Sequence, residues 1–194
     1  MNDAPSRKHG VYLALVHHPV RDRAGAIITT SVTNLDVHDI ARSARTYGVS
    51  RYYVVTPIAA QRALIQHILG YWRGGRGGER VPERAEALSI IEDVASIEDA
   101  LKDIEAREGA APCVMTTAAR SGFAVTTFES ARGMLKARER PALLVFGTGY
   151  GLADTVIARA DVHLAPVRPG GYNHLAVRAA VSIILDRLFG DEGA

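Results

Sequence analysis

Two glycine-rich loops in the last third of the chain constrain the fold most. The first loop, GTGYG at residues 147–151, follows the apolar run ALLVF, and the second, around Gly170 and Gly171, follows VHLAP. Each loop also precedes a predicted helix. Because glycine carries no side chain, such loops let a ligand approach the backbone closely. We therefore expect the two loops to clasp one small cofactor.

The pattern of apolar residues predicts an α/β fold. Short apolar runs alternate with helical patterns, which favours a single domain with a mostly parallel sheet flanked by helices. Strands are expected at residues 11–16, 51–57, 89–96, 112–117, 142–146 and 162–166, with an extended piece at 26–30. Helices are expected at residues 37–48, 58–72, 82–88, 97–109, 128–140, 152–159 and 173–189, and a flexible loop at 73–82. We expect the domain to span residues 11–190, after a disordered N-terminus at residues 1–10.

Polar residues at the expected helix starts are candidate caps. Asn34 or Asp36 can cap the first helix, and Ser96 can cap the helix at residues 97–109. Asn173 can cap the last helix. The last helix is apolar over most of its circumference, so it is buried on more than one side. It is either a simple core helix or a helix packed on its own sheet and on a partner subunit.

Charge and cysteine content exclude few classes of protein. The formal net charge is +2, which does not by itself demand a nucleic-acid partner. Cys113 is the only cysteine, so an intrachain disulfide is impossible, and we expect no metal site. The run VYLALV is too short for a signal core or a membrane span. We therefore expect a cytoplasmic protein without a membrane partner.

The loop at residues 147–151 differs from a dinucleotide fingerprint. That fingerprint reads G-x-G-x-x-G after the first strand, whereas this chain has G-x-G-x-G with under fifty residues to follow. No acidic residue lies about twenty positions further on to hold a ribose. A nucleotide-dependent oxidoreductase is therefore the weaker alternative, and a simple strand-to-helix turn is a further one.

Three motifs together resemble the SPOUT, or alpha/beta-knot, class of RNA methyltransferases. FGTGYGL and PGGYNHLAVRAA resemble the two C-terminal motifs of that class, and DVHDIARSARTYGV resembles its first motif. Asp36 stands where the first motif has Asn, His38 where it has Gly, and Arg42 where it has Arg. The closest resemblance is to a little-studied bacterial branch of SAM-dependent RNA methyltransferases.

The resemblance implies a C-terminal trefoil knot, S-adenosylmethionine (SAM) as cofactor, and a homodimer with sites at its interface. The catalytic residues that it implies are Arg42, Asp36 and His174. The cofactor-binding residues that it implies are Thr116, Thr117, Gly147, Thr148, Gly149, Gly151, Leu152, Leu164, Pro166, Gly170, Tyr172, Asn173 and Leu175. The expected activity is methyl transfer to a nucleotide of tRNA or rRNA, and the alternative is a non-catalytic knotted SAM- or RNA-binding protein.

The substrate side stays open between several interpretations. Arg42 can grip a phosphate, because a guanidinium matches phosphate oxygens in a fork, or it can form a surface salt bridge with Asp39 or Asp36. His38 can be a base or a metal ligand, or a member of an acid-rich helix start. Arg73, Arg76 and Arg80 can track RNA phosphates or lie in a solvated loop. Tyr71 and Trp72 can stack bases or pack into the core.

Overall fold

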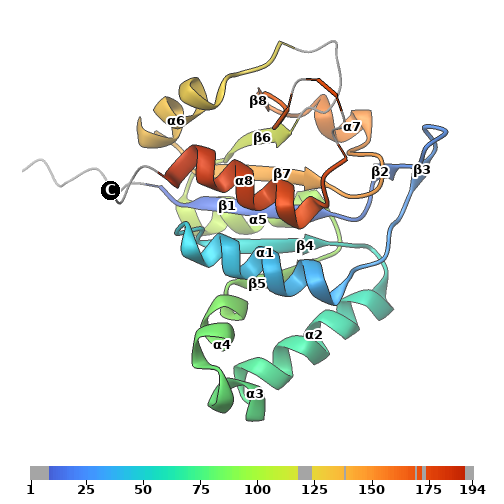
Figure 1. Cartoon of the computed structure of the whole chain (residues 1–194), viewed down its shortest axis with the longest axis vertical. Coiled ribbons are helices and arrows are strands. Elements are labelled where there is room, and N and C mark those ends of the chain that lie inside the picture. Colours follow the sequence, from blue (N-terminus) through green and yellow to red (C-terminus); the bar gives the residue numbers. More distant parts are fainter. Residues whose placement is uncertain (1–8, 118–123, 138, 169, 172–173, 191–194) are drawn as a thin grey trace, which may run out of the picture.

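A six-stranded sheet forms the centre of the molecule in a computed structural model (Figure 1). The structure describes residues 9–117, 124–137, 139–168, 170–171 and 174–190. The strand order is β5-β4-β1-β7-β6-β8, and every pairing in this sheet is parallel. This arrangement confirms the predicted α/β class and single domain.

The elements follow one another in the order expected from the sequence. The strands of the sheet are β1 (Val11–Val16), β4 (Arg51–Val55), β5 (Ile91–Val94), β6 (Cys113–Thr117), β7 (Ala142–Gly147) and β8 (Val162–Leu164). The helices are α1 (Asn34–Thr46), α2 (Ala59–Arg73), α3 (Arg76–Arg80), α4 (Pro82–Ser89), α5 (Ile97–Glu108), α6 (Phe128–Ala137), α7 (Asp154–Ile157) and α8 (Val177–Phe189). A small antiparallel ribbon of β2 (Val20–Arg21) and β3 (Ile27–Ile28) accounts for the predicted extended piece.

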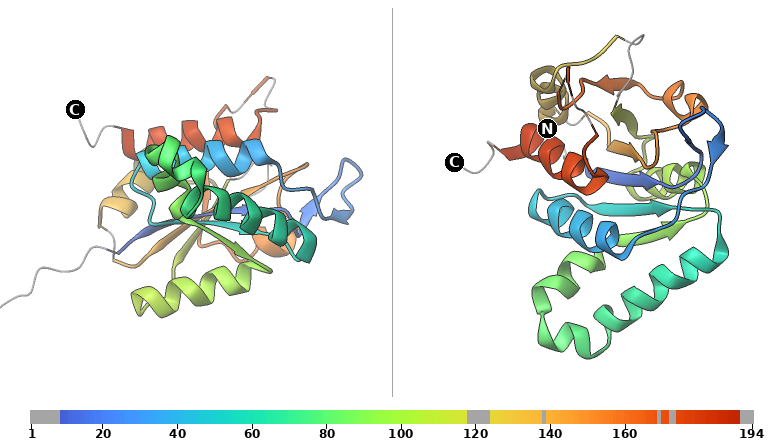
Figure 2. Two further views of the ribbon diagram at one scale, coloured as in Figure 1. Left: turned by 90° about the horizontal axis from the view of Figure 1, so that it is seen from below. Right: turned by 45° about the vertical axis from the view of Figure 1, so that its right-hand side comes forward.

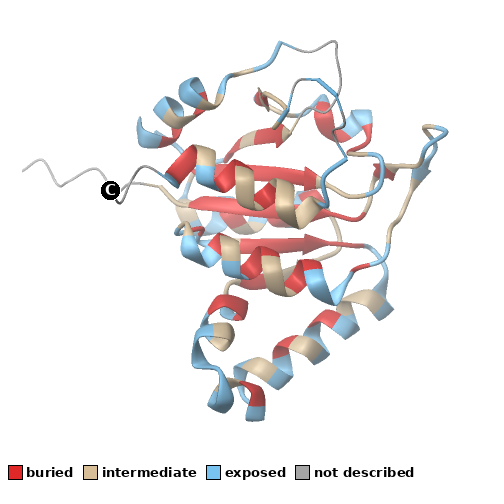
Figure 3. Ribbon diagram, viewed as in Figure 1, coloured by how far each residue is buried: buried red, intermediate tan, exposed pale blue. Residues whose placement is uncertain are grey.

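Helices cover the two faces of the sheet unequally. Figure 2 (left) shows α1, α2, α4 and α8 on one face and α5 on the other. Successive residues of β1 alternate between the two cores: Leu13 and Leu15 pack with the first set of helices, whereas Tyr12 and Ala14 pack with α5 and α7. Figure 3 shows the central strands buried along their length. Strands buried on both faces read as continuous apolar runs, which is the pattern that the sequence showed.

Two helix starts differ from the predictions. Thr33, and neither Asn34 nor Asp36, caps α1: its backbone is extended, and its hydroxyl accepts a hydrogen bond from the Asp36 amide at 3.1 Å. α8 begins at Val177, with Ala176 at its N-cap position, rather than at residue 173, and Asn173 lies outside the described residues. Ser96, in contrast, caps α5 in a capping box with Asp99, as predicted.

The N-terminal boundary of the ordered domain lies earlier than predicted. Residues 1–8 fall outside the described residues, but His9 and Gly10 do not fit a disordered segment. The Gly10 amide donates to the Glu108 carboxylate at 3.1 Å, and His9 Nδ1 lies 3.0 Å from the same group. These bonds tie the start of β1 to the end of α5.

The predicted trefoil knot stays a prediction. β8 lies at one edge of the sheet, yet α8 packs beside α1 near the middle, where the Ser43 and Ser182 hydroxyls are 2.8 Å apart. The chain therefore returns from the edge of the sheet to its centre between β8 and α8. Residues 169 and 172–173 of this return lie outside the described residues, as do residues 118–123.

The segment expected to be a flexible loop at residues 73–82 is folded. It contains α3, and Gly77 is buried there against the rings of Tyr71 and Trp72. Arg73 is not directed at a phosphate site, because its Nη2 donates to the carbonyl oxygens of Leu88, Ser89 and Ile91. One guanidinium thus joins the end of α2 to the end of α4 and the start of β5. Among the described residues, no helix combines the length and apolar character needed to cross a bilayer.

Replacing Arg73 tests this role. We expect Arg73→Gln to lower the free energy of unfolding by about 1–2 kcal/mol, because the α4 carbonyls lose a charged donor. Urea unfolding followed by circular dichroism measures the change. Arg80→Gln, in the same segment, should leave stability within about 0.5 kcal/mol of the parent. Equal stability of both variants would contradict the role of Arg73.

Candidate functional site

The carboxyl ends of β1 and β7 mark the point where the strand order reverses. From β1 the chain moves outward through β4 to β5. The later strands β6, β7 and β8 then lie on the other side of β1 within the same sheet. In open α/β sheets ligands bind at such a switch point. The loops that follow β1 and β7 are joined by four backbone hydrogen bonds of 2.9–3.2 Å: Arg21 to Gly151, Tyr150 to Arg21, Thr148 to Val16 and Ala153 to Pro19.

A cavity of about 960 Å³ opens at this switch point, on the α8 side of the sheet. Its walls come from the loop after β1, the loop after β7, the segment after β8 and the first turns of α8. The cavity brings together many residues that the sequence singled out. They are Asp36, Thr117, Gly147, Thr148, Gly149, Gly151, Leu152, Pro166, His174 and Leu175.

Glycines give this cavity its shape. A Cβ atom on Gly147 would lie 2.7 Å from the Leu152 amide nitrogen, so no larger residue fits there. Gly149 has φ +60°, and a Cβ atom on it would lie 3.0 Å from the Arg21 carbonyl oxygen. Gly171, on the opposite wall, has φ +75°. The residues present therefore fit a cofactor that is held largely by backbone groups.

Other predicted cofactor residues lie away from the cavity. Thr116 is fully buried, and its hydroxyl is 3.0 Å from His163 Nδ1 on β8, so it joins two strands. Leu164 is fully buried in the core, and Gly170 is exposed beside the cavity without lining it. Tyr172 and Asn173 lie outside the described residues.

Asp36 is the buried acid of the cavity. Its side chain accepts a hydrogen bond of 2.6 Å from the Thr33 hydroxyl and lies 3.5 Å from the Arg178 guanidinium of α8. Arg178 also lies 3.6 Å from Asp39, so one guanidinium holds α8 against two acids of α1. Arg178 was not among the site residues predicted from the sequence. The feature that could have indicated it is its position as the one charged residue in the first two turns of α8.

Arg42 and His38 are separated from the cavity. Both line a different groove on the far side of α1, next to α2. Of the two interpretations of Arg42, the salt bridge with Asp36 or Asp39 is not formed, because both acids lie near Arg178 instead. The three predicted catalytic residues therefore divide, with Asp36 and His174 at the cavity and Arg42 elsewhere.

A buried polar chain supports the loop after β7. His17 Nδ1 lies 3.0 Å from the Thr30 hydroxyl, which contacts the Thr148 hydroxyl, and Thr148 donates to the Val16 carbonyl at 3.1 Å. His17 is fully buried, and burial lowers its pKa to about 4. The imidazole is therefore neutral at pH 7.

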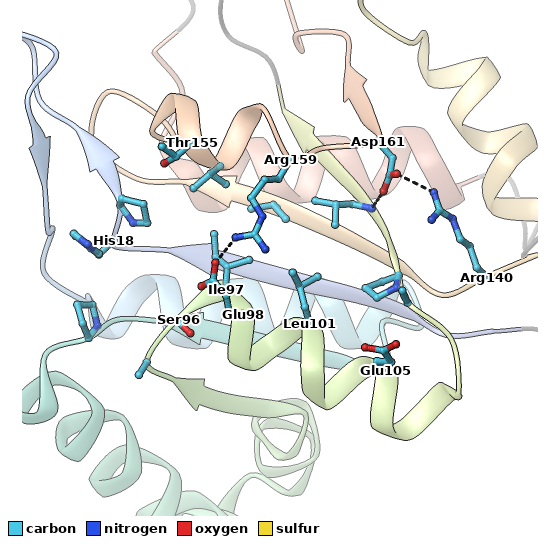
Figure 4. A pocket seen from close by; sticks show the side chains of 18 residues that line it. His18, Ser96, Ile97, Glu98, Leu101, Glu105, Arg140, Thr155, Arg159 and Asp161 are labelled. Carbon is cyan, nitrogen blue, oxygen red and sulfur yellow. Dashed lines mark hydrogen bonds and ion pairs between the residues drawn. The ribbon is translucent and has the colours of Figure 1, made fainter.

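A second cavity, of about 710 Å³, lies on the opposite face of the sheet between α5 and α7 (Figure 4). Ile97 and Leu101 line one wall, and the charged side chains pair across the space. Arg159 pairs with Glu98, and Arg140 lies 3.1 Å from Asp161. Glu105 also lines this cavity and belongs to neither pair, so the lining combines apolar side chains with paired and unpaired charges. In the part of the chain that the structure describes, no group of His, Cys, Asp and Glu could hold a metal ion.

Comparison with known proteins identifies relatives over nearly the whole domain. Residues 10–190 match the family described as SAM-dependent RNA methyltransferase. The chain is 47% identical over 182 residues to a tRNA (guanine-N(1)-)-methyltransferase of Oleidesulfovibrio alaskensis, covering 93% of this chain and 42% of that protein. It is 41% identical over 180 residues to an uncharacterized protein of Aquifex aeolicus, covering 92% of this chain and 88% of that protein.

A solved structure supports the fold. The TrmH/SpoU tRNA modifying enzyme of A. aeolicus has a TM-score of 0.59 and 16% identity to this chain, covering 96% of it and 76% of that enzyme. This similarity confirms the α/β fold that the resemblance to the SPOUT class implied. The chain spans less than half the length of the O. alaskensis relative, so the activity in that protein's name can belong to its unmatched part.

Substitution of Gly147 tests whether the glycines of the loop after β7 shape a cofactor site. We expect Gly147→Ala to weaken SAM binding at least tenfold and to lower the free energy of unfolding by about 1–3 kcal/mol, because the new methyl group overlaps the Leu152 backbone. Calorimetry and urea unfolding measure the two effects. Gly133→Ala, in α6 with open space around it, is the control and should be neutral or slightly stabilising. Unchanged SAM affinity in Gly147→Ala would contradict a role of Gly147 in shaping the cofactor site.

Burial of His17 makes stability depend on pH. Its pKa is about 4 when folded and 6.5 in the reference state, so between these values the unfolded chain binds a proton that the folded chain does not. The free energy of unfolding should therefore fall as the pH is lowered from about 6.5 to about 4, by up to roughly 3 kcal/mol from this residue. Urea unfolding over this range should show a smaller slope in His17→Asn. The same slope in both proteins would contradict a neutral buried imidazole.

Proposed function

The chain belongs to the SAM-dependent RNA methyltransferase family, and from that premise we propose that it transfers the methyl group of SAM to a nucleotide of tRNA or rRNA. The observation that carries the proposal is the glycine-shaped cavity at the switch point of the sheet. The family description names both the cofactor and the class of substrate. The structure supplies a cavity of suitable size at the edge where α/β sheets bind ligands.

The loop after β7 and the first turns of α8 would hold the cofactor. Gly147, Gly149 and Gly151 allow a flat ring to lie against peptide groups, and Leu152 and Pro166 supply apolar contact. α8 starts without a side-chain cap, so its first amides remain available as donors at the cavity wall. SAM supplies a methyl group that its sulfonium already activates.

The remaining task of the protein is to position the target atom and to remove its proton where one must leave. Asp36 is our candidate for the proton acceptor, because it is the buried carboxylate of the cavity and its orientation is fixed by Thr33 and Arg178. His174 lies on the same cavity and is the second candidate. Arg42 is proposed to hold RNA rather than to act at the reacting atom, because it lies across α1 from the cavity.

We propose a homodimer in which α1 and α8 contribute the interface. Leu175, which comes shortly before α8, is 46% exposed, so a large apolar side chain is uncovered at the N-terminal end of this helix. α1 and α8 lie side by side, which gives one continuous surface for a second copy of this chain (Figure 1). A monomer by size-exclusion chromatography with light scattering would contradict this interface. We infer a cytoplasmic location from the RNA substrate.

The proposed activity predicts separate roles in binding and in transfer. We expect the purified chain to bind SAM and S-adenosylhomocysteine by calorimetry, and to methylate tRNA or rRNA from a strain that lacks this protein. Asp36→Asn should keep SAM affinity within about threefold, yet lower the transfer rate by about a hundredfold or more, because it removes a base. Mass spectrometry of digested nucleosides measures the transfer.

Three outcomes distinguish the hypotheses. Binding of SAM without any methylated nucleoside supports the non-catalytic alternative. Full transfer by Asp36→Asn removes Asp36 as the base and leaves His174 to be tested in the same way. Failure to bind SAM at all contradicts the proposed function.

A further inference from the structure

A groove of about 490 Å³ lies between α1, α2 and α4. It is separate from the cofactor cavity, since the two share no lining residue. α1 stands between them: Thr33 and Asp36 face the cavity, whereas Leu35, His38 and Arg42 face the groove. Figure 1 shows α2 and α4 beyond α1, past the β5 edge of the sheet. Residues of both helices line the groove opposite α1.

The groove carries a net positive charge, because two arginines and one acid, Asp39, line it. Arg42 and Arg84 both line it, and neither makes an ion pair with any residue that the structure describes. Asp39, the acid that lines the groove, lies 3.6 Å from Arg178 on the other side of α1. The Nε atom of Arg84 is buried without a hydrogen-bond partner among the described residues. Arg42 is exposed and Arg84 is half-buried, so both guanidinium groups are accessible from the groove. A guanidinium binds phosphate oxygens through a fork of N–H donors, so these two point to an anionic ligand.

Aromatic rings lie beside these charges. Trp72 is partly buried, with its ring 5.6 Å from His38 and 5.3 Å from Tyr71, both edge-on. The guanidinium of Arg84 lies 5.2 Å from the centre of the Trp72 ring and covers it. Tyr71 is 50% exposed, and His67 is exposed on the same wall, so rings remain available at the mouth of the groove. Trp72 therefore packs into the core, while Tyr71 remains able to stack a base.

We propose that this groove binds a nucleotide of unpaired RNA, at a position distinct from the nucleotide that receives the methyl group. The phosphate lies between Arg42 and Arg84, and the base stacks on Tyr71. Guanidinium groups beside aromatic rings bind single-stranded nucleic acid in this way, because every base has a π face and every linkage an anion. A base-paired duplex would present only its phosphates to the groove, so the site favours a loop or an unpaired end. The proposal rests on the proposed function only in taking RNA as the ligand.

The test measures binding of a short fluorescein-labelled single-stranded RNA by anisotropy at several salt concentrations. Arg84→Gln should weaken binding about tenfold and lower the slope of log affinity against log salt by about 1. Tyr71→Ala should weaken binding by roughly five- to hundredfold with the slope unchanged, and Tyr71→Phe should bind as the parent does. Arg80→Gln removes the same charge from the neighbouring helix α3, outside the groove, and should change little.

The outcomes separate this inference from the proposed function. If RNA is methylated normally, but Arg84→Gln and Tyr71→Ala bind the probe as the parent does, the groove is excluded and the function stands. If these variants bind weakly while the parent shows no transfer, the groove stands and the function fails. Equal weakening by Arg80→Gln would overturn the groove in favour of diffuse surface charge, as would absence of RNA binding by the parent. Calorimetry with SAM shows whether each variant keeps an intact cofactor cavity.

Discussion

Hydrogen bonding between the loops after β1 and β7 determines where the functional end of this molecule lies. Both strands are buried at the centre of a parallel sheet, where an unpaired peptide group would be costly. The four backbone hydrogen bonds pair peptide groups at the ends of these strands and in the loops that follow them. They fix the path of residues 147–153. The buried chain of His17, Thr30 and Thr148 adds side-chain bonds beneath the same loop. The cavity is thus shaped mainly by peptide groups, and glycine is required at Gly147 because a neighbouring backbone passes close to it.

Much of the fold could be predicted because local pattern and tertiary position agree. The apolar runs at residues 11–16 and 142–146 are buried on both faces, and Ser96 caps α5 through bonds within one turn. The loop predicted at residues 73–82 was wrong for a tertiary reason. Its glycines suggested flexibility. Gly77, however, lies in a helical segment where the rings of Tyr71 and Trp72 leave no room for a larger side chain. The first predicted cap was wrong because Thr33, and neither Asn34 nor Asp36, takes the extended backbone that a cap requires.

The candidate site was predictable in part. The order of the glycine loops indicated which backbone segments would meet, and the cavity contains them. The pairing of Arg178 with Asp36 could not be predicted, because it joins residues 142 positions apart and depends on how α8 packs against α1. The groove beside α2 depends likewise on contacts between helices that are distant in sequence. Its position also changes the interpretation of Arg42, which the motif alone associated with the reacting centre.

α1 is a wall common to both sites, and this has a thermodynamic consequence. One face of the helix reaches the cavity through Asp36, and another reaches the groove through His38 and Arg42. Arg178 clamps the helix to α8, whose first turn borders the cavity. A small rotation of α1 on filling one site would alter the width of the other. The two ligands would then be energetically coupled, and by reciprocity each would change the affinity for the other by the same factor.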